Sequence, residues 1–170
     1  MKKIFVVLVV LGTLLFGNDT LKTFDEGMKY LLGQGVKQDK NKAFTLLNKA
    51  ADEGSSEAQY NLALMYYMGD GVEQNVTKSA QLLEKSAKAG YQKAVVNVGR
   101  IYMQLLDFDK AIEWLEKNVQ NGDMEANYLL AEIYVEKGDF ATAKTYAKKA
   151  IDNGYGEAQI LWRDYNLSNY

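Results

Sequence analysis

The fold is decided by residues 57–90, which read EAQYNLALMYYMGDGVEQNVTKSAQLLEKSAKAG. In the first half, small and apolar residues recur at the three- and four-residue steps of one helical face, which predicts a helix over 56–68. These residues are Ala58, Leu62, Ala63, Met65 and Tyr66. The second half repeats those steps at Ser79, Ala80, Leu82, Leu83, Ser86 and Ala87. A second helix is therefore expected over 76–88, joined to the first by a turn that contains two glycines.

The same pattern recurs along the chain at a nearly constant spacing. Tyr30, Tyr66, Tyr102 and Tyr134 follow one another at 36, 36 and 32 residues. Two further series keep a similar period. One consists of the glycines Gly54, Gly90, Gly122 and Gly154, and the other of the alanines Ala58, Ala94, Ala126 and Ala158. A repeat of this length is typical of stacked helix pairs, in which each pair buries its apolar stripe against the next.

The repeat predicts an all-α fold, a right-handed α/α superhelical solenoid of about four helix-turn-helix units. The units are expected at 21–54, 57–90, 93–122 and 125–154, within a single solenoid over 18–170. A C-terminal capping helix is expected over 156–170, because Glu157-Ala158-Gln159 copies Glu57-Ala58-Gln59. In this cap Arg163 replaces the small residue and Asn166 the tyrosine, which suits a terminal helix that faces water.

Small residues are expected where the paired helices cross. Gly27, Ala63, Gly99 and Ala131 are equivalent in the repeat. Helices approach most closely where side chains are small.

The turn inside each pair has two lengths. The first two units carry long turns with Gly33 and Gly35, and with Gly69 and Gly71, where positive φ angles are expected. Asp39 and Asn75 then stand where the second helix needs an N-cap.

Composition excludes several kinds of chemistry. The 170 residues include no His, Cys or Pro. Without His and Cys there is no Ser-His-Asp triad, thiolate nucleophile, disulfide or zinc site of the usual ligands. We therefore expect no cofactor and no metal. The absence of Pro suits a chain that is nearly all helix.

The N-terminus resembles a secretory signal. Lys2 and Lys3 precede a mainly apolar run over 4–16, and Gly17 follows it. Cleavage after Gly17 would leave 18 basic and 22 acidic residues, a net charge of −4. That charge argues against nucleic acid as a partner. The alternative is an uncleaved anchor, in which case this segment alone would contact a membrane.

Residues 57–90 resemble the Sel-one-like repeat (SLR) family, a relative of the tetratricopeptide repeat. The resemblance is carried by residues 57–67, by Gly69-Asp70-Gly71-Val72 and by Leu83-x-Lys85-Ser86-Ala87 before Gly90. The first unit matches at Gly33-Gln34-Gly35-Val36, whereas the third and fourth units look like plain tetratricopeptide units. The resemblance implies a protein–protein interaction scaffold with a protein or peptide partner. Together with the N-terminal signal pattern it predicts a periplasmic or secreted location in a Gram-negative-type envelope.

The resemblance also implies that the first helix of each pair lines a concave face. Its outward-facing residues would be Tyr60, Leu64, Tyr67, Val96, Arg100, Met103, Tyr128, Glu132 and Val135. Tyr66 and its equivalents are expected in the core instead. Tyr60, Tyr67 and Tyr128 are open to two interpretations, binding or packing between repeats. For Arg100 the alternative to partner binding is an ion pair with a nearby acid such as Glu132.

Other functions have weaker support from the residues. Some cysteine-rich secreted members of the family are described as penicillin-binding or β-lactam-hydrolysing proteins, but Ser-x-x-Lys, Ser-Asp-Asn and Lys-Thr-Gly are all absent here. The nearest match is Thr145-x-x-Lys148, and Glu132 and Glu136 are a candidate acid/base pair on one helix. We expect a protein that is not an enzyme. A third hypothesis is a scaffold whose copies stack end to end.

Two acceptor patterns for bacterial N-glycosylation are present. Asn75-Val76-Thr77 and Asn166-Leu167-Ser168 each carry an acidic residue two positions before the Asn. The pattern predicts modification at Asn75 and Asn166 in a host that has the enzyme. Alternatively, Asn75 is only a helix cap, like Asp39.

Overall fold

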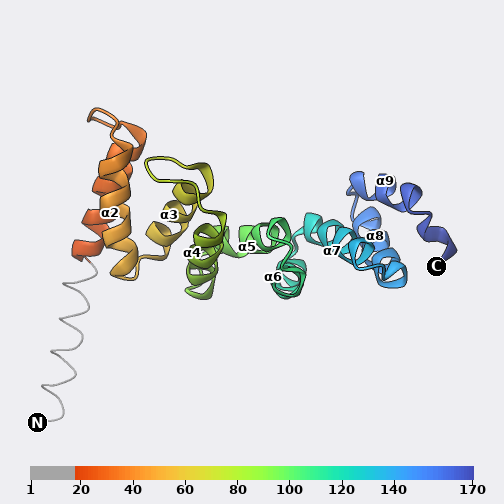
Figure 1. The fold of residues 1–170 in the computed structure, drawn as a ribbon. Helices are drawn as coiled ribbons and strands as arrows, with labels where there is room; N and C mark the ends of the chain where they lie inside the picture. The colour runs from red at the N-terminus through yellow and green to blue at the C-terminus, as the bar shows by residue number, and fades with distance from the viewer. Residues whose placement is uncertain (1–17) are drawn as a thin grey trace, which may run out of the picture. The chain divides into compact units, whose positions relative to one another are not determined.

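A computed structural model describes residues 18–170 and shows only helices, turns and loops over that range (Figure 1). The predicted signal segment, 1–17, lies outside the described residues. The chain divides into two compact units at the Tyr91–Gln92 junction. The described part of the first unit begins with a helix over 18–32. The remaining helices of this unit are α2 (Lys40–Asp52), α3 (Ser56–Met68) and α4 (Val76–Lys88).

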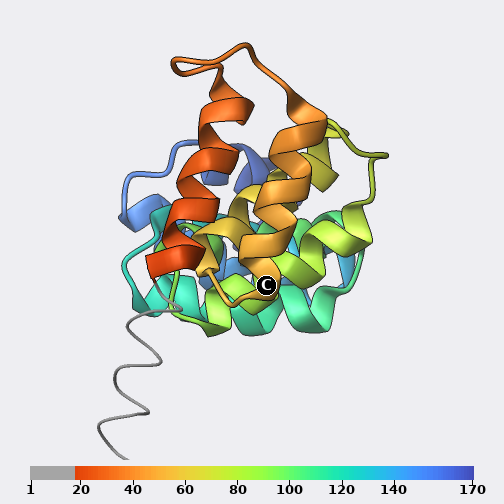
Figure 2. The same ribbon diagram turned by 90° about the vertical axis from the view of Figure 1, so that its left-hand side faces the viewer.

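The second unit continues the helix pairs. Its helices are α5 (Gln92–Gln104), α6 (Phe108–Gln120), α7 (Met124–Glu136), α8 (Phe140–Asp152), α9 (Glu157–Asp164) and the short 3₁₀ helix η1 (Leu167–Asn169). The predicted helices over 56–68 and 76–88 agree with α3 and α4 at both ends. Within the first unit, the helix over 18–32 lies side by side with α2, as both views show (Figure 2). The expected helix pairs are therefore confirmed.

The long turns take the predicted conformation. Gly69 and Gly71 have φ angles of 75° and 70°, in the left-handed region that favours glycine. Asn75 then caps α4, because its side chain accepts a hydrogen bond from the Lys78 backbone N–H at 2.8 Å. Its own backbone N–H donates to the Tyr66 carbonyl at 2.8 Å, which closes the loop back onto α3. Asp39 caps α2 in the same way.

Close helix crossings occur at the small residues. A Cβ atom added to Gly99 would lie 2.8 Å from Leu115 side-chain carbons, and one added to Gly27 would lie 3.0 Å from Leu47 Cγ. Ala63 is fully buried at the equivalent position. The paired helices therefore approach too closely for a larger residue, as the spacing predicts.

The repeated tyrosines differ in burial. Tyr102 is buried, whereas Tyr30, Tyr66 and Tyr134 are half-buried at the edges of their apolar clusters. The prediction that these four tyrosines lie in the core is therefore confirmed in full only for Tyr102.

A lysine from the second helix covers three of these rings. Lys42, Lys78 and Lys110 lie 3.9, 5.2 and 4.8 Å from the ring centroids of Tyr30, Tyr66 and Tyr102. The fourth unit has Thr142 at that position, and Tyr134 instead stacks on Tyr146 at 5.6 Å. A cation–π contact of this kind adds electrostatic attraction to the packing of the ring.

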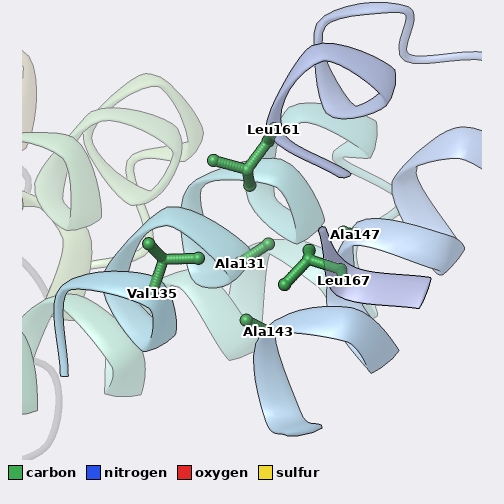
Figure 3. Close-up of a cluster of buried hydrophobic side chains, with 6 residues drawn as sticks. All are labelled: Ala131, Val135, Ala143, Ala147, Leu161 and Leu167. Atoms are coloured by element: carbon green, nitrogen blue, oxygen red, sulfur yellow. The ribbon is translucent and has the colours of Figure 1, made fainter. Parts of the chain in front are cut away.

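The C-terminal cap differs from the prediction. The capping helix ends at Asp164 and does not continue to 170. Asn166 takes a left-handed conformation, φ 50°, that reverses the chain, and Leu167 then becomes fully buried. Leu167 packs in one cluster with Ala131, Ala143 and Leu161 (Figure 3). The cap therefore combines an exposed polar face with an apolar anchor that returns to the core.

Val135 belongs to the same cluster, and the prediction that it faces outward was wrong. The repeat register places it among the outward-facing residues of the first helix, but it is buried. Figure 3 shows its side chain on α7 among the apolar side chains of this cluster. The physical reason is that the chain returning through η1 supplies an apolar partner for the end of α7.

Ser79 gives a stability prediction. It is fully buried on α4 and its hydroxyl has no hydrogen-bond partner among the described residues. The equivalent residues of the other units are alanines, Ala43, Ala111 and Ala143, all fully buried. We expect Ser79→Ala to raise the free energy of unfolding by about 1 kcal/mol, because it removes an unsatisfied buried hydroxyl and improves helix propensity.

Urea denaturation followed by circular dichroism measures this change. Thr77→Ala is the control, since Thr77 is exposed in the first turn of the same helix. A loss of stability in Ser79→Ala would mean that the hydroxyl contributes a favourable interaction.

Candidate functional site

The first helices of the pairs carry the predicted binding residues, and the two units are described separately. In the first unit, Tyr60 and Leu64 on α3 are half-buried, and Tyr67 is 40% exposed. The Tyr60 ring lies 5.2 Å from the Tyr91 ring, centroid to centroid. Tyr60 is therefore engaged in packing within the unit, and Tyr67 is the more accessible of the two tyrosines.

In the second unit, Arg100 on α5 is held by two carboxylates. Its guanidinium group is 2.5 Å from Glu125 and 3.6 Å from Asp123, and it also donates to the Val96 carbonyl at 2.7 Å. The expected partner Glu132 makes no ion pair with it. The reason is the direction of the side chain, which bends toward the N-terminal end of α5 and so meets the first turn of α7.

Tyr128 and Tyr155 form the aromatic part of this face. Their ring centroids are 5.1 Å apart. The Tyr128 hydroxyl donates a hydrogen bond to Glu132 one helical turn along α7. Val96 and Met103 on α5 are half-buried apolar residues of the predicted set.

Tyr155 is a site residue that the sequence analysis missed, although a signal existed. It follows the turn glycine Gly154, as Tyr91 follows Gly90. Each of these tyrosines packs against the tyrosine near the start of the preceding first helix, which is Tyr60 for Tyr91 and Tyr128 for Tyr155. Extending the register comparison to the residue after the glycine would have found the pair.

The electrostatics of this face are dominated by carboxylates. Burial raises the pKa of Glu132 above its ordinary value, and the nearby charges of Glu157 and Glu125 raise it further. Burial and the hydrogen bond with Glu132 raise the pKa of Tyr128. A hydrogen bond with Glu157, together with burial, raises the pKa of Tyr155 to about 12. Both tyrosines therefore stay protonated at neutral pH and act as hydrogen-bond donors.

We name this group the acidic-tyrosine face. It consists of Arg100, Glu125, Tyr128, Glu132, Tyr155 and Glu157. Three carboxylates and one guanidinium group leave an excess of negative charge, and the cation is already paired with Glu125. The face can therefore accept a cationic group, and its two rings provide an apolar surface beside the carboxylates.

The weaker catalytic candidates have local roles. The Thr145 hydroxyl donates to the Ala141 carbonyl at 3.2 Å, and Lys148 pairs with Asp152 at 3.4 Å. The two side chains are therefore not arranged as a nucleophile with its base.

Metal clusters and membrane spans are both absent from the described range, 18–170. No cluster of three or more acidic residues there is placed to hold a metal ion. None of the helices in that range has the length and apolar character needed to cross a membrane.

The two glycosylation candidates differ in their surroundings. Asn75 is half-buried, and its Oδ1 atom caps α4 while Nδ2, the atom that a glycan would modify, is not the capping atom. Asn166 is exposed, and its Oδ1 accepts a hydrogen bond from Ser168 at 3.2 Å. Leu167, which lies between Asn166 and Ser168, is fully buried, so the second acceptor segment packs against the core. Modification at either residue stays a prediction.

Comparison with known proteins gives the family. Residues 27–55 and 56–91 match the Sel1 repeat, and residues 91–119 and 125–153 match the tetratricopeptide repeat. The chain belongs to the Sel1-like repeat proteins and their tetratricopeptide relatives. The change from one repeat type to the other follows the loss of the Gly-x-Gly-Val turn, as the sequence predicts. A search of curated proteins finds no match to this Sel1-like repeat protein.

Solved structures support the same assignment. The Sel1-like repeat protein is 30% identical, with a TM-score of 0.65, to c5321, described as a protective antigen of uropathogenic Escherichia coli with an SLR fold. It is 25% identical to a Sel1 repeat protein from Oxalobacter formigenes, TM-score 0.69, and 25% identical to MamA, TM-score 0.62. The matches cover 82%, 85% and 84% of this chain, in the same order.

The matched structures differ in length. The match spans 32% of c5321, 63% of the Oxalobacter protein and 82% of MamA. The chain is thus shorter than the first two relatives, and the comparison supports a shared repeat fold.

Proposed function

We propose that this Sel1-like repeat protein is a periplasmic or secreted interaction scaffold that binds a basic segment of a protein partner on the acidic-tyrosine face. Repeats of the Sel1 and tetratricopeptide types commonly serve as protein-interaction scaffolds. The proposed location rests on the basic and apolar pattern of residues 1–17. The proposed partner chemistry rests on the second unit, where the carboxylates and tyrosine rings of the acidic-tyrosine face lie close together.

One observation carries the proposal, namely the excess of carboxylate groups, the half-buried Glu132 among them, beside a tyrosine pair. Arg100 is the cation that contacts these groups, and Glu125 and Asp123 already hold it. Glu132 and Glu157 have no such cationic partner within the described residues. Burial and neighbouring carboxylates raise the pKa of Glu132 by more than the Tyr128 hydrogen bond lowers it, so its charged form is only partly compensated. A lysine or arginine from a partner would compensate it.

The tyrosine pair adds the apolar part of the contact. Tyr128 and Tyr155 present adjacent rings, and the Tyr128 hydroxyl is oriented by its hydrogen bond to Glu132. Tyrosine and arginine are enriched where binding energy concentrates, because a ring buries a large area with few rotatable bonds. A segment that combines a basic residue with an aliphatic one would contact both parts of the face.

Labelled peptides test this proposal. A short peptide rich in lysine and leucine is expected to bind about tenfold more tightly than its glutamate-for-lysine counterpart, measured by fluorescence anisotropy at moderate ionic strength. Glu132→Gln should weaken binding of the basic peptide about fivefold, which corresponds to about 1 kcal/mol. Tyr128→Ala should weaken it by about tenfold or more.

The matched control is Glu113→Gln on α6, which makes the same charge change at an exposed residue that pairs with Lys117. It should leave peptide affinity unchanged. Equal affinity for the basic and acidic peptides, or no effect of Glu132→Gln, would contradict the proposed site. Circular dichroism of each variant separates loss of binding from loss of helix.

A further inference from the structure

The second unit contains a polar cavity whose lining includes none of the residues of the acidic-tyrosine face. It lies between the α6–α7 turn and the last turn of α8, has a volume of about 410 Å³, and is lined by Val119, Asp123, Asn127, Lys149 and Asn153 among others. Asn127 is only 4% exposed, and its Oδ1 atom has no hydrogen-bond partner among the described residues. Buried side-chain amides are nearly always satisfied, so this atom requires an explanation.

Comparison within the chain shows why the amide nitrogen of Asn127 is left without a partner. The equivalent of Asn127 in the second repeat is Gln59, which is also buried and whose Oε1 atom likewise has no hydrogen-bond partner among the described residues. The Gln59 Nε2 atom donates to the Ala51 carbonyl at 3.2 Å, and Val119 is the repeat equivalent of Ala51. The Asn127 side chain is one methylene shorter, and it makes no hydrogen bond with Val119 or with any other described residue. Its amide therefore has unused hydrogen-bonding capacity at the wall of the cavity.

The charges around the cavity select against ions. Lys149 and Asp123 both line it, with opposite charges. Asp123 would repel an anion and is itself close to Arg100, while Lys149, exposed at the rim beside the Tyr146 ring, would repel a cation. A neutral group that both donates and accepts would complement the Asn127 amide, and the Asn153 side chain offers a second amide nearby.

We propose that this cavity, the Asn127 pocket, binds a side-chain carboxamide of a partner protein, an asparagine or glutamine, through a reciprocal amide–amide pair. Its amide hydrogen is donated to Asn127 Oδ1, and its oxygen accepts from Asn127 Nδ2. Water occupies an open polar cavity of this kind when no partner is bound. A carboxamide reproduces the hydrogen bonds of the water that it displaces, so binding leaves no polar group without a hydrogen-bond partner.

Nuclear magnetic resonance of the ¹⁵N-labelled chain tests the pocket with small probes. N-acetylglutamine methylamide is expected to shift the side-chain NH₂ signals of Asn127 and the backbone signals of Gly122 and Asp123. N-acetylglutamate methylamide has the same backbone groups and is the matched control. It should need at least tenfold higher concentration for the same shift. Equal responses to the two probes, or no saturable response to the glutamine probe, would show that the cavity holds only water and would overturn the proposal.

A substitution that copies the second repeat provides the independent test. Asn127→Gln should reach the Val119 carbonyl, as Gln59 reaches Ala51, and so close the pocket while the helices stay intact. We expect the response to the glutamine probe to fall at least fivefold. An unchanged response would overturn the proposal. Because Asn127 is not part of the acidic-tyrosine face, binding of the basic peptide should persist in this variant, which separates the two proposals.

Discussion

Gly71→Ala is expected to lower the free energy of unfolding by about 3 kcal/mol. The φ angle of Gly71 is 70°, which costs an alanine roughly 1 kcal/mol. In addition, a Cβ atom at this position would lie 2.5 Å from the Lys40 carbonyl oxygen and 2.7 Å from its carbonyl carbon. These are backbone atoms at the start of α2, so the α3–α4 loop must move away from α2. Overpacking of this kind costs about 1–3 kcal/mol.

Gly35→Ala is the matched control for this prediction. Gly35 is the equivalent glycine of the first repeat, with a φ angle of 71°, but no atom lies within 4 Å of its added Cβ. It should lose only about 1 kcal/mol, the cost of the backbone conformation. Urea unfolding followed by circular dichroism measures both variants. Equal losses would mean that the α2 contact contributes nothing.

Leu167→Ala is expected to lower the free energy of unfolding of the second unit by about 3 kcal/mol. Leu167 is fully buried in the cluster that joins α7, α8, α9 and η1 (Figure 3). Truncating a buried leucine removes apolar contacts and leaves a cavity, at a cost of about 2–5 kcal/mol. The loss should be visible in urea unfolding and as faster hydrogen exchange in α9.

The control for Leu167 is Tyr165→Ala, two residues earlier and 43% exposed. A change at this exposed position should stay within about 0.5 kcal/mol. If Leu167→Ala were equally mild, the C-terminal segment would not anchor the cap. An effect confined to Leu167 would support the packing in which η1 covers the end of α7.

The candidate site was only partly predictable. The sequence placed Tyr128 and Glu132 on one face of α7, one helical turn apart, and the structure joins them by a hydrogen bond. It did not predict that Arg100 pairs with Glu125, because that choice depends on the direction of a long side chain and on the spacing between α5 and α7. The Asn127 pocket could not be predicted either. It depends on whether an asparagine, one methylene shorter than the glutamine of the second repeat, reaches the Val119 carbonyl.

The sequence by itself determined the repeat, the helix boundaries of its second unit and the turn glycines. These features are local, because helical periodicity, N-caps and positive φ angles depend on residues within one or two turns of each other. The tertiary structure alone decided that Val135 is buried, that Leu167 returns to the core and that Tyr155 joins Tyr128. Those outcomes depend on which surfaces meet across helices, and the energy of such contacts is set by distances that periodicity does not specify.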